Sequence, residues 1–262
     1  MGIEAVRTPD ARFADLEDWP YPPRYLESLP GFPGLRLHYV DVGPADGEVF
    51  LCLHGEPTWS YLYRKMIPVF VAAGKRVIAP DWFGFGRSDK PVADGAYSFQ
   101  FHRETLTGLI GALSLERFVL VCQDWGGLLG LTLPVSHADH LAGLVVMNTA
   151  LAVGMAPGEG FLKWRDYVAN SPDFDVGRLM GRSVPGITPD EIAAYNAPFP
   201  GPEFKAGVRT FPSLVPIEPT MAGAAISRDA FGFWSTQWTG PSFMAIGMQD
   251  PVLGPPIMRQ LR

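Results

Sequence analysis

The chain has 262 residues, 47% of them hydrophobic, and a formal net charge of −6 at pH 7. This length and composition suit one large α/β domain with an insertion better than two independent domains. The acidic balance and the scattered 21 Lys and Arg residues argue against nucleic acid or an anionic membrane as a partner. The longest apolar stretch, residues 141–156, contains Asn148 and Thr149, so it falls short of the ~18 apolar residues a spanning helix needs. The N-terminus also lacks a signal-peptide core, and we expect a cytoplasmic protein.

Strand-like and helix-like segments alternate over residues 35–148, which predicts a mostly parallel sheet with helices on its faces. Helical spacing occurs at residues 61–73 and 101–113. The expected strands of this part are residues 35–42, 49–53, 76–79, 118–122 and 144–148.

The pattern changes after residue 148 to a segment rich in proline and aromatic residues, where short helices are expected. A strand signal returns at residues 242–247, and Asp250 follows it. We therefore predict a core in two parts, residues 1–148 and 228–262, interrupted by a helical cap at residues 149–227. Asp250 would lie at the carboxyl end of a strand, where ligands bind in open parallel sheets.

Residues 122–126, Cys-Gln-Asp-Trp-Gly, have the pattern of a nucleophile elbow with Asp124 in the position that usually holds serine. An apolar run precedes this turn, and a glycine-rich helix start follows it. An ionised carboxylate there is a nucleophile without deprotonation, because its unperturbed pKa is near ~4. The alternative from these residues alone is an aspartate that caps the next helix.

Two backbone N–H groups are candidates for an oxyanion hole. Glu56 lies in a glycine-bearing turn after the predicted strand 49–53, and Trp125 directly follows Asp124. A plain strand-end turn is the alternative for Glu56. The G-x-G at residues 84–86 lacks the rest of a dinucleotide fingerprint, and the histidines lack metalloprotease spacing. We expect no cofactor and no metal.

These segments together resemble the haloalkane dehalogenases, which have the α/β-hydrolase fold. Similar motifs occur at residues 54–59, 81–91, 122–127 and 243–250, so the resemblance covers almost the whole chain. Residues 161–164, Phe-Leu-Lys-Trp, look like the cap segment that carries the second halide-binding tryptophan in the branch typified by the dichloroethane-degrading enzyme. Asp124-Trp125 combined with Trp164 is the specific part of the match, because the other motifs occur across related hydrolases.

The resemblance implies a catalytic Asp124, an acidic triad member at Asp250, and a halide site formed by Trp125 and Trp164. An indole N–H is a pure donor, so it can bind the leaving halide without competing as a nucleophile. The implied substrates are a small haloalkane and water, and the products are an alcohol and a halide ion. We expect a monomer.

Two other functions stay open from the sequence. An epoxide hydrolase also uses an aspartate in this elbow, with cap tyrosines as O–H donors, and Tyr167 and Tyr195 are the candidates for them. A ligand-binding protein on the same fold, without turnover, is the second alternative.

The chain departs from the family pattern at its carboxyl end. The family's hydrolytic step needs a histidine after the acidic residue, and no histidine follows His140 here. A last strand and helix of the family are also missing, so we expect a fragment of a longer protein. We expect its reaction to stop at the alkyl ester on Asp124.

Overall fold

The computed structural model describes residues 2–259. Its main sheet has seven strands in the order β2-β3-β5-β4-β7-β8-β9. The pairs among β4, β5, β7, β8 and β9 are parallel, whereas β3 is antiparallel to both β2 and β5. The strands are β2 (Arg24–Leu26), β3 (Leu37–Val42), β4 (Val49–Leu53), β5 (Arg76–Pro80), β7 (Phe118–Gln123), β8 (Leu141–Met147) and β9 (Ser242–Ala245). β1 (Ala5–Val6) and β6 (Lys90–Pro91) form a separate antiparallel pair.

The expected mostly parallel sheet is confirmed, and the differences lie at strand ends. The first predicted strand begins at Leu37 instead of residue 35, because the backbone N–H of Arg36 donates to the carboxylate of Asp89 and not to a neighbouring strand. β8 starts three residues earlier than predicted and stops before Asn148, whose φ of 32° is incompatible with a strand. The short edge strand β2 was not predicted.

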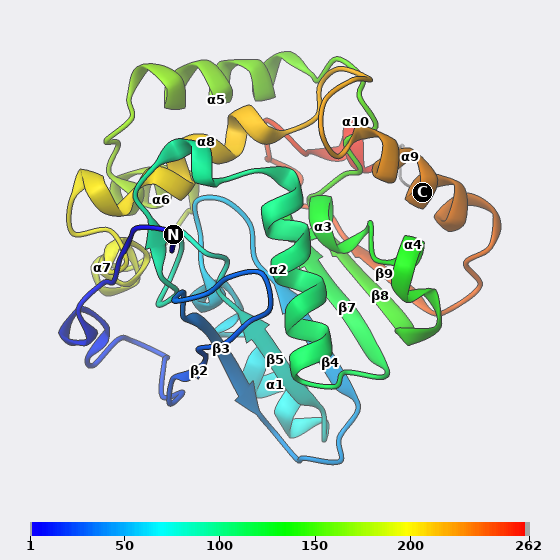
Figure 1. Ribbon diagram of the computed structural model, residues 1–262, viewed down its shortest axis with the longest axis horizontal. Coiled ribbons are helices and arrows are strands. Elements are labelled where there is room, and N and C mark those ends of the chain that lie inside the picture. Colours follow the sequence, from blue (N-terminus) through cyan, green and yellow to red (C-terminus); the bar gives the residue numbers. More distant parts are fainter. Residues whose placement is uncertain (1, 260–262) are drawn as a thin grey trace.

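Helices flank this sheet and cover one end of it (Figure 1). The connections between β4 and β8 contain α1 (Ile67–Ala72), α2 (Phe99–Ala112), α3 (Trp125–Gly130) and α4 (Pro134–His137). The predicted helix 61–73 is instead a 3-10 turn, η2 (Ser60–Tyr63), followed by α1, which has a proline in its first turn. Further 3-10 turns are η1 (Asp10–Phe13), η3 (Asp94–Ala96), η4 (Ala138–His140) and η5 (Pro202–Phe204).

The proline-rich segment forms short helices, as expected: α5 (Glu159–Asn170), α6 (Val176–Ser183), α7 (Pro189–Asn196) and α8 (Ala206–Leu214). They lie together beyond one end of the sheet (Figure 1). α9 (Ala224–Thr236) and the short α10 (Pro255–Met258) complete the chain, and the predicted boundary at residue 227 falls inside α9. The division into core and cap stays a prediction.

A polar network joins α7 to the core. Arg64 and Lys65, which precede α1, both donate to one carboxylate oxygen of Glu191, and Arg64 also donates to the Tyr195 hydroxyl over 3.0 Å. The second oxygen of Glu191 accepts the N–H of Thr188 in a capping box. These charges attach the outer cap helices to the sheet layer. Within residues 2–259, no helix has the length and apolar character needed to cross a membrane.

Parallel register brings the functional segments to one edge of the sheet. Leu53 of β4 pairs with Cys122 of β7, and Met147 of β8 pairs with both Gln123 of β7 and Ala245 of β9. The carboxyl ends of these strands are therefore level, and the residues after them emerge side by side under the cap. The buried apolar runs of β4 and β7 form the rigid base of this edge.

Candidate active site

Asp124 occupies a strained turn between β7 and α3. Its φ of 49° and ψ of −122° lie outside the regions that side-chain-bearing residues normally adopt. The turn is tight, because a Cβ on Gly126 would lie 1.9 Å from the carbonyl oxygen of Leu53. A Cβ on Gly127 would meet Thr149 Oγ1 at 2.2 Å. Only glycine fits at either position, and the elbow expected from the spacing is present.

Two backbone groups act on the Asp124 carboxylate. The N–H of Glu56 donates to Oδ1 over 2.7 Å, and the adjacent N–H of Trp125 also favours its ionised form. Burial nevertheless raises the pKa of Asp124 to about 6, with a smaller contribution from the negative charge of Asp250, while the two N–H groups oppose that rise. The residues expected to form an oxyanion hole thus converge on the nucleophile itself.

The side chain of Glu56, for which the sequence suggested no role, also lies in this site. Its Oε2 accepts the indole N–H of Trp164 over 3.2 Å, and its Oε1 is buried without a hydrogen-bond partner in residues 2–259. Burial raises the pKa of Glu56 well above its ordinary value, and the neighbouring charge of Asp124 adds to that rise. Because the charge of ionised Asp124 adds to the rise, Glu56 holds its proton after Asp124 has ionised.

The two tryptophans come from different layers. Trp125 starts α3, and its buried ring packs against Phe211 of α8 with ring centroids 4.3 Å apart. Trp164 lies on α5 and packs against Tyr167 and Phe174, at 5.8 and 5.7 Å. The sequence did not single out Phe211 as a site residue, and its place in a buried helical stripe offered no signal.

Asp250 lies at the same edge of the sheet as Asp124. Its Oδ1 accepts the N–H groups of Val252 and Leu253, both over 2.8 Å, and its Oδ2 accepts Asn148 Nδ2 over 2.9 Å. The carbonyl oxygen of Asn148 in turn accepts the N–H of Asp124 over 3.0 Å. One residue therefore bridges the two acidic positions. The sequence predicted Asn148 only as the end of a strand. Its polar side chain at the carboxyl end of that strand was the feature that could have indicated a role in the site.

The buried histidines His54 and His102 make no hydrogen bond to Asp124 in residues 2–259. His54 Nδ1 donates to the Gly55 carbonyl over 2.9 Å, and its Nε2 accepts the Trp82 N–H over 3.1 Å. Both nitrogens are thus engaged, and burial lowers the pKa of His54 to about 4. Burial also lowers the pKa of His102 to about 3, and its ring packs edge-on against Phe211.

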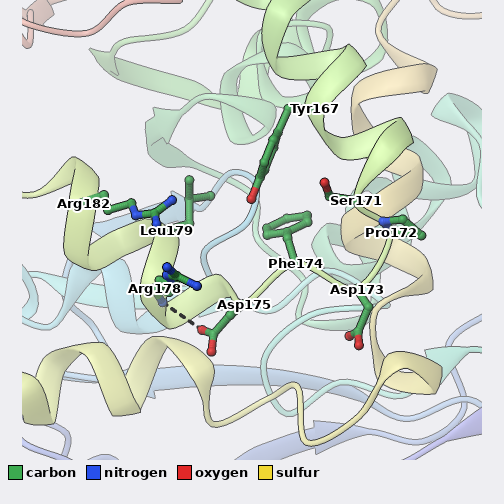
Figure 2. A pocket seen from close by; sticks show the side chains of 9 residues that line it. All are labelled: Tyr167, Ser171, Pro172, Asp173, Phe174, Asp175, Arg178, Leu179 and Arg182. Carbon is green, nitrogen blue, oxygen red and sulfur yellow. Dashed lines mark hydrogen bonds between the residues drawn. The ribbon is translucent and has the colours of Figure 1, made fainter.

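The two tyrosines of the epoxide alternative are not arranged as a pair of donors. Tyr195 is buried, and its hydroxyl accepts from Arg64 in the α7 network. Tyr167 is 42% exposed and lines a cleft of about 510 Å³ between α5 and α6, with its hydroxyl directed into that cleft beside Phe174 (Figure 2).

Comparison with known proteins agrees with this geometry. Residues 48–262 match the family model of the alpha/beta hydrolase fold. A haloalkane dehalogenase of Psychrobacter cryohalolentis is 44% identical over 95% of this chain and 83% of its own length. One of Mycobacterium marinum is 44% identical over 96% of this chain and 86% of its own. The chain belongs to the haloalkane dehalogenase family.

A solved structure supports the same assignment. The haloalkane dehalogenase DpaA from Paraglaciecola agarilytica, described as tetrameric, superimposes with a TM-score of 0.97 at 48% identity, over 99% of this chain and 87% of that one. The α/β-hydrolase fold and the haloalkane dehalogenase family expected from the sequence are both confirmed. The epoxide hydrolase alternative is not favoured.

Proposed function

We propose that this haloalkane dehalogenase converts haloalkanes to alcohol and halide through an alkyl ester on Asp124. The observation that carries this proposal is the carboxylate of Asp124 on a nucleophile elbow, held by the N–H groups of Glu56 and Trp125. A serine hydrolase would need a base next to its nucleophile, whereas an ionised carboxylate attacks carbon directly.

In the first step, an oxygen of Asp124 forms a bond to the carbon that bears the halogen. The carbon–halogen bond breaks, and its electron pair leaves with the halide. The indole N–H groups of Trp125 and Trp164 bind that halide as its charge develops, which is where hydrogen bonds accelerate a reaction. Each bond to a charged acceptor contributes roughly 1.5–3 kcal/mol.

In the second step, water gives a proton to a base and its oxygen bonds to the carboxyl carbon of the ester. The oxyanion that results forms on the former carboxylate of Asp124, so the N–H groups of Glu56 and Trp125 are already within reach of it. The tetrahedral intermediate then breaks the bond from that carbon to the alkyl oxygen, so the alcohol leaves with a proton and the Asp124 carboxylate is regenerated. We assign Asp250 the role of orienting a histidine base and stabilising its imidazolium. No histidine of the chain follows Asp250, and the groups described above leave the base of this step unassigned.

Mass spectrometry of the intact protein tests the first step. Exposure to a bromoalkane is expected to add one alkyl group to Asp124, and Asp124→Ala should lose both the adduct and bromide release while keeping its circular dichroism spectrum. An adduct formed only with an epoxide would support the rival hydrolase, and no adduct with either reagent would support a binding protein. Bromide release by Asp124→Ala at the original rate would remove Asp124 as nucleophile.

We also propose a small haloalkane and water as the molecules this site accepts, with the preferred haloalkane set by packing of the cap. The chain is expected to be monomeric in the cytoplasm. A relative at 48% identity is described as tetrameric, so sedimentation velocity is the measurement that decides between a monomer and a higher assembly.

A further inference from the structure

The donor expected to bind the halide is already occupied in this structure. The indole N–H of Trp164 donates to Oε2 of Glu56 over 3.2 Å. An N–H group has one hydrogen, so it cannot make a full bond to Glu56 and to a halide at the same time. Halide binding at Trp164 therefore competes with the Glu56 carboxyl.

Glu56 is fixed in place by the nucleophile. Its backbone N–H donates to Asp124 over 2.7 Å, and it follows Gly55, where an added Cβ would lie 2.3 Å from the Cβ of Asp124. The backbone of Glu56 cannot move away while the elbow is intact. Its carboxyl lies beside both the Asp124 carboxylate and the Trp164 indole, so a change in its protonation changes the charge next to the expected halide donor.

Resting on the proposed halide site, we propose that the Glu56 side chain controls, through its protonation, whether the indole N–H of Trp164 is available to a halide. In its protonated form it gives up the indole N–H to a halide, and in its ionised form it retains that N–H and repels the halide. Glu56 is a positioning residue in this proposal, because it acts on the halide through Trp164 and through its charge.

The surroundings decide which form the resting enzyme has. Asp124 is the charged group that faces Glu56 from the elbow, and Asp250 stands behind Asp124. The cap contributes the neutral indole of Trp164, and His54 is neutral because both its nitrogens are engaged. The pKa of Glu56 is raised by burial and by the charge of Asp124. Glu56 therefore stays protonated, and the Trp164 N–H stays available to a halide, until the pH passes that raised pKa. The buried, unpartnered Oε1 can carry the proton.

The test is the dissociation constant of bromide, measured by tryptophan fluorescence at constant ionic strength from about pH 5 to about pH 9. The wild-type chain is expected to lose bromide affinity in two phases as the pH rises, the first from Asp124 near pH 6 and the second from Glu56. The second phase should weaken binding roughly tenfold or more, since like charges this close repel strongly at low effective dielectric.

Three variants separate the groups. Glu56→Gln should abolish the second phase, and Asp124→Asn should abolish the first and move the second to lower pH, because the charge of Asp124 raises the pKa of Glu56. Glu159→Gln removes the same charge from an exposed position of α5, where Glu159 pairs with Lys163, and should behave as wild type. A pH profile of bromide affinity in Glu56→Gln identical to wild type would overturn the proposed control by Glu56. Bromide binding absent at every pH would overturn the halide site itself, and with it the role of Glu56.

A second measurement needs no change at Glu56. The indole N–H resonance of Trp164 in the halide-free protein, assigned by its loss in Trp164→Phe, should shift as Glu56 ionises, at a pH above the titration of Asp124. A Trp164 resonance that follows only Asp124 would also overturn the proposal.

Discussion

At the scale of the residue, burial and two N–H groups oppose each other at Asp124. The pKa of its carboxyl is raised to about 6, so the nucleophilic form is lost as the pH falls through that value. We predict that the rate of alkylation by a bromoalkane decreases about tenfold per pH unit as the pH falls below about 6.

Single-turnover mass spectrometry over a pH series measures this rate directly. Glu159→Gln is the matched control for a general change in charge, and it should give the wild-type profile. A rate that stays constant down to the ordinary pKa of aspartate, near ~4, would show that burial does not perturb the nucleophile.

At the scale of the element, α3 and α5 each carry one tryptophan of the proposed halide site. Trp125 is held by Phe211 of α8, and Trp164 by Tyr167 and Phe174 of the cap. We predict that Trp125→Phe and Trp164→Phe each weaken bromide binding roughly tenfold or more, because each removes a hydrogen bond to a charge worth roughly 1.5–3 kcal/mol. Isothermal titration calorimetry measures the bromide affinity of these variants without relying on tryptophan fluorescence. Unchanged affinity in both variants would refute the paired site.

The ion pairs that attach α7 to the core depend on pH. The side chains of Arg64 and Glu191 are 9% and 5% exposed, and the pKa of Glu191 is lowered to about 2, first by its bond from Arg64 and then by that from Lys65. A lowered folded-state pKa means that this stabilisation is present above the unfolded value and is lost as the pH falls toward 2.

We predict that Glu191→Gln lowers the free energy of unfolding by roughly 2 kcal/mol, less than the loss for a fully buried pair because Lys65 is 65% exposed. Urea unfolding near neutral pH measures it. Glu159→Gln, in an exposed pair, should cost about 0.5 kcal/mol or less. Equal losses in the two variants would mean that the network does not stabilise the attachment of the cap.

At the scale of the whole molecule, the two chemical steps have different requirements. Alkylation by Asp124 needs no general base, whereas ester hydrolysis needs an activated water, and a positioned base contributes ~10²–10⁴-fold to such a step. No histidine follows His140, and both nitrogens of His54 are engaged. We therefore predict that the 262-residue chain releases at most about one halide per protein and remains alkylated.

Bromide release measured against protein concentration tests this prediction, and an added carboxyl-terminal segment that supplies a histidine near Asp250 is expected to restore turnover. Sustained turnover by the 262-residue chain would assign the base to another group and change our interpretation of the second step.

The sequence predicted those parts of the fold and site that depend on neighbouring residues. The alternation of apolar runs and helical spacing indicated a mostly parallel sheet, and an aspartate between a strand and two glycines indicated the elbow at Asp124. Both are decided within a few residues by backbone sterics and hydrophobic period. The short edge strand β2 carries too few residues for a period, so its antiparallel pairing with β3 escaped prediction.

The sequence by itself determined the fold class and the family, and it predicted Asp124 as the nucleophile and Trp125 and Trp164 as the halide-binding pair. Only the tertiary structure decided how these groups meet. The bond from Trp164 to Glu56 spans 108 positions of the chain, and that from Asn148 to Asp250 spans 102. Contacts of this kind depend on strand register and on how the cap packs over the sheet, and no local preference of the chain encodes either distance.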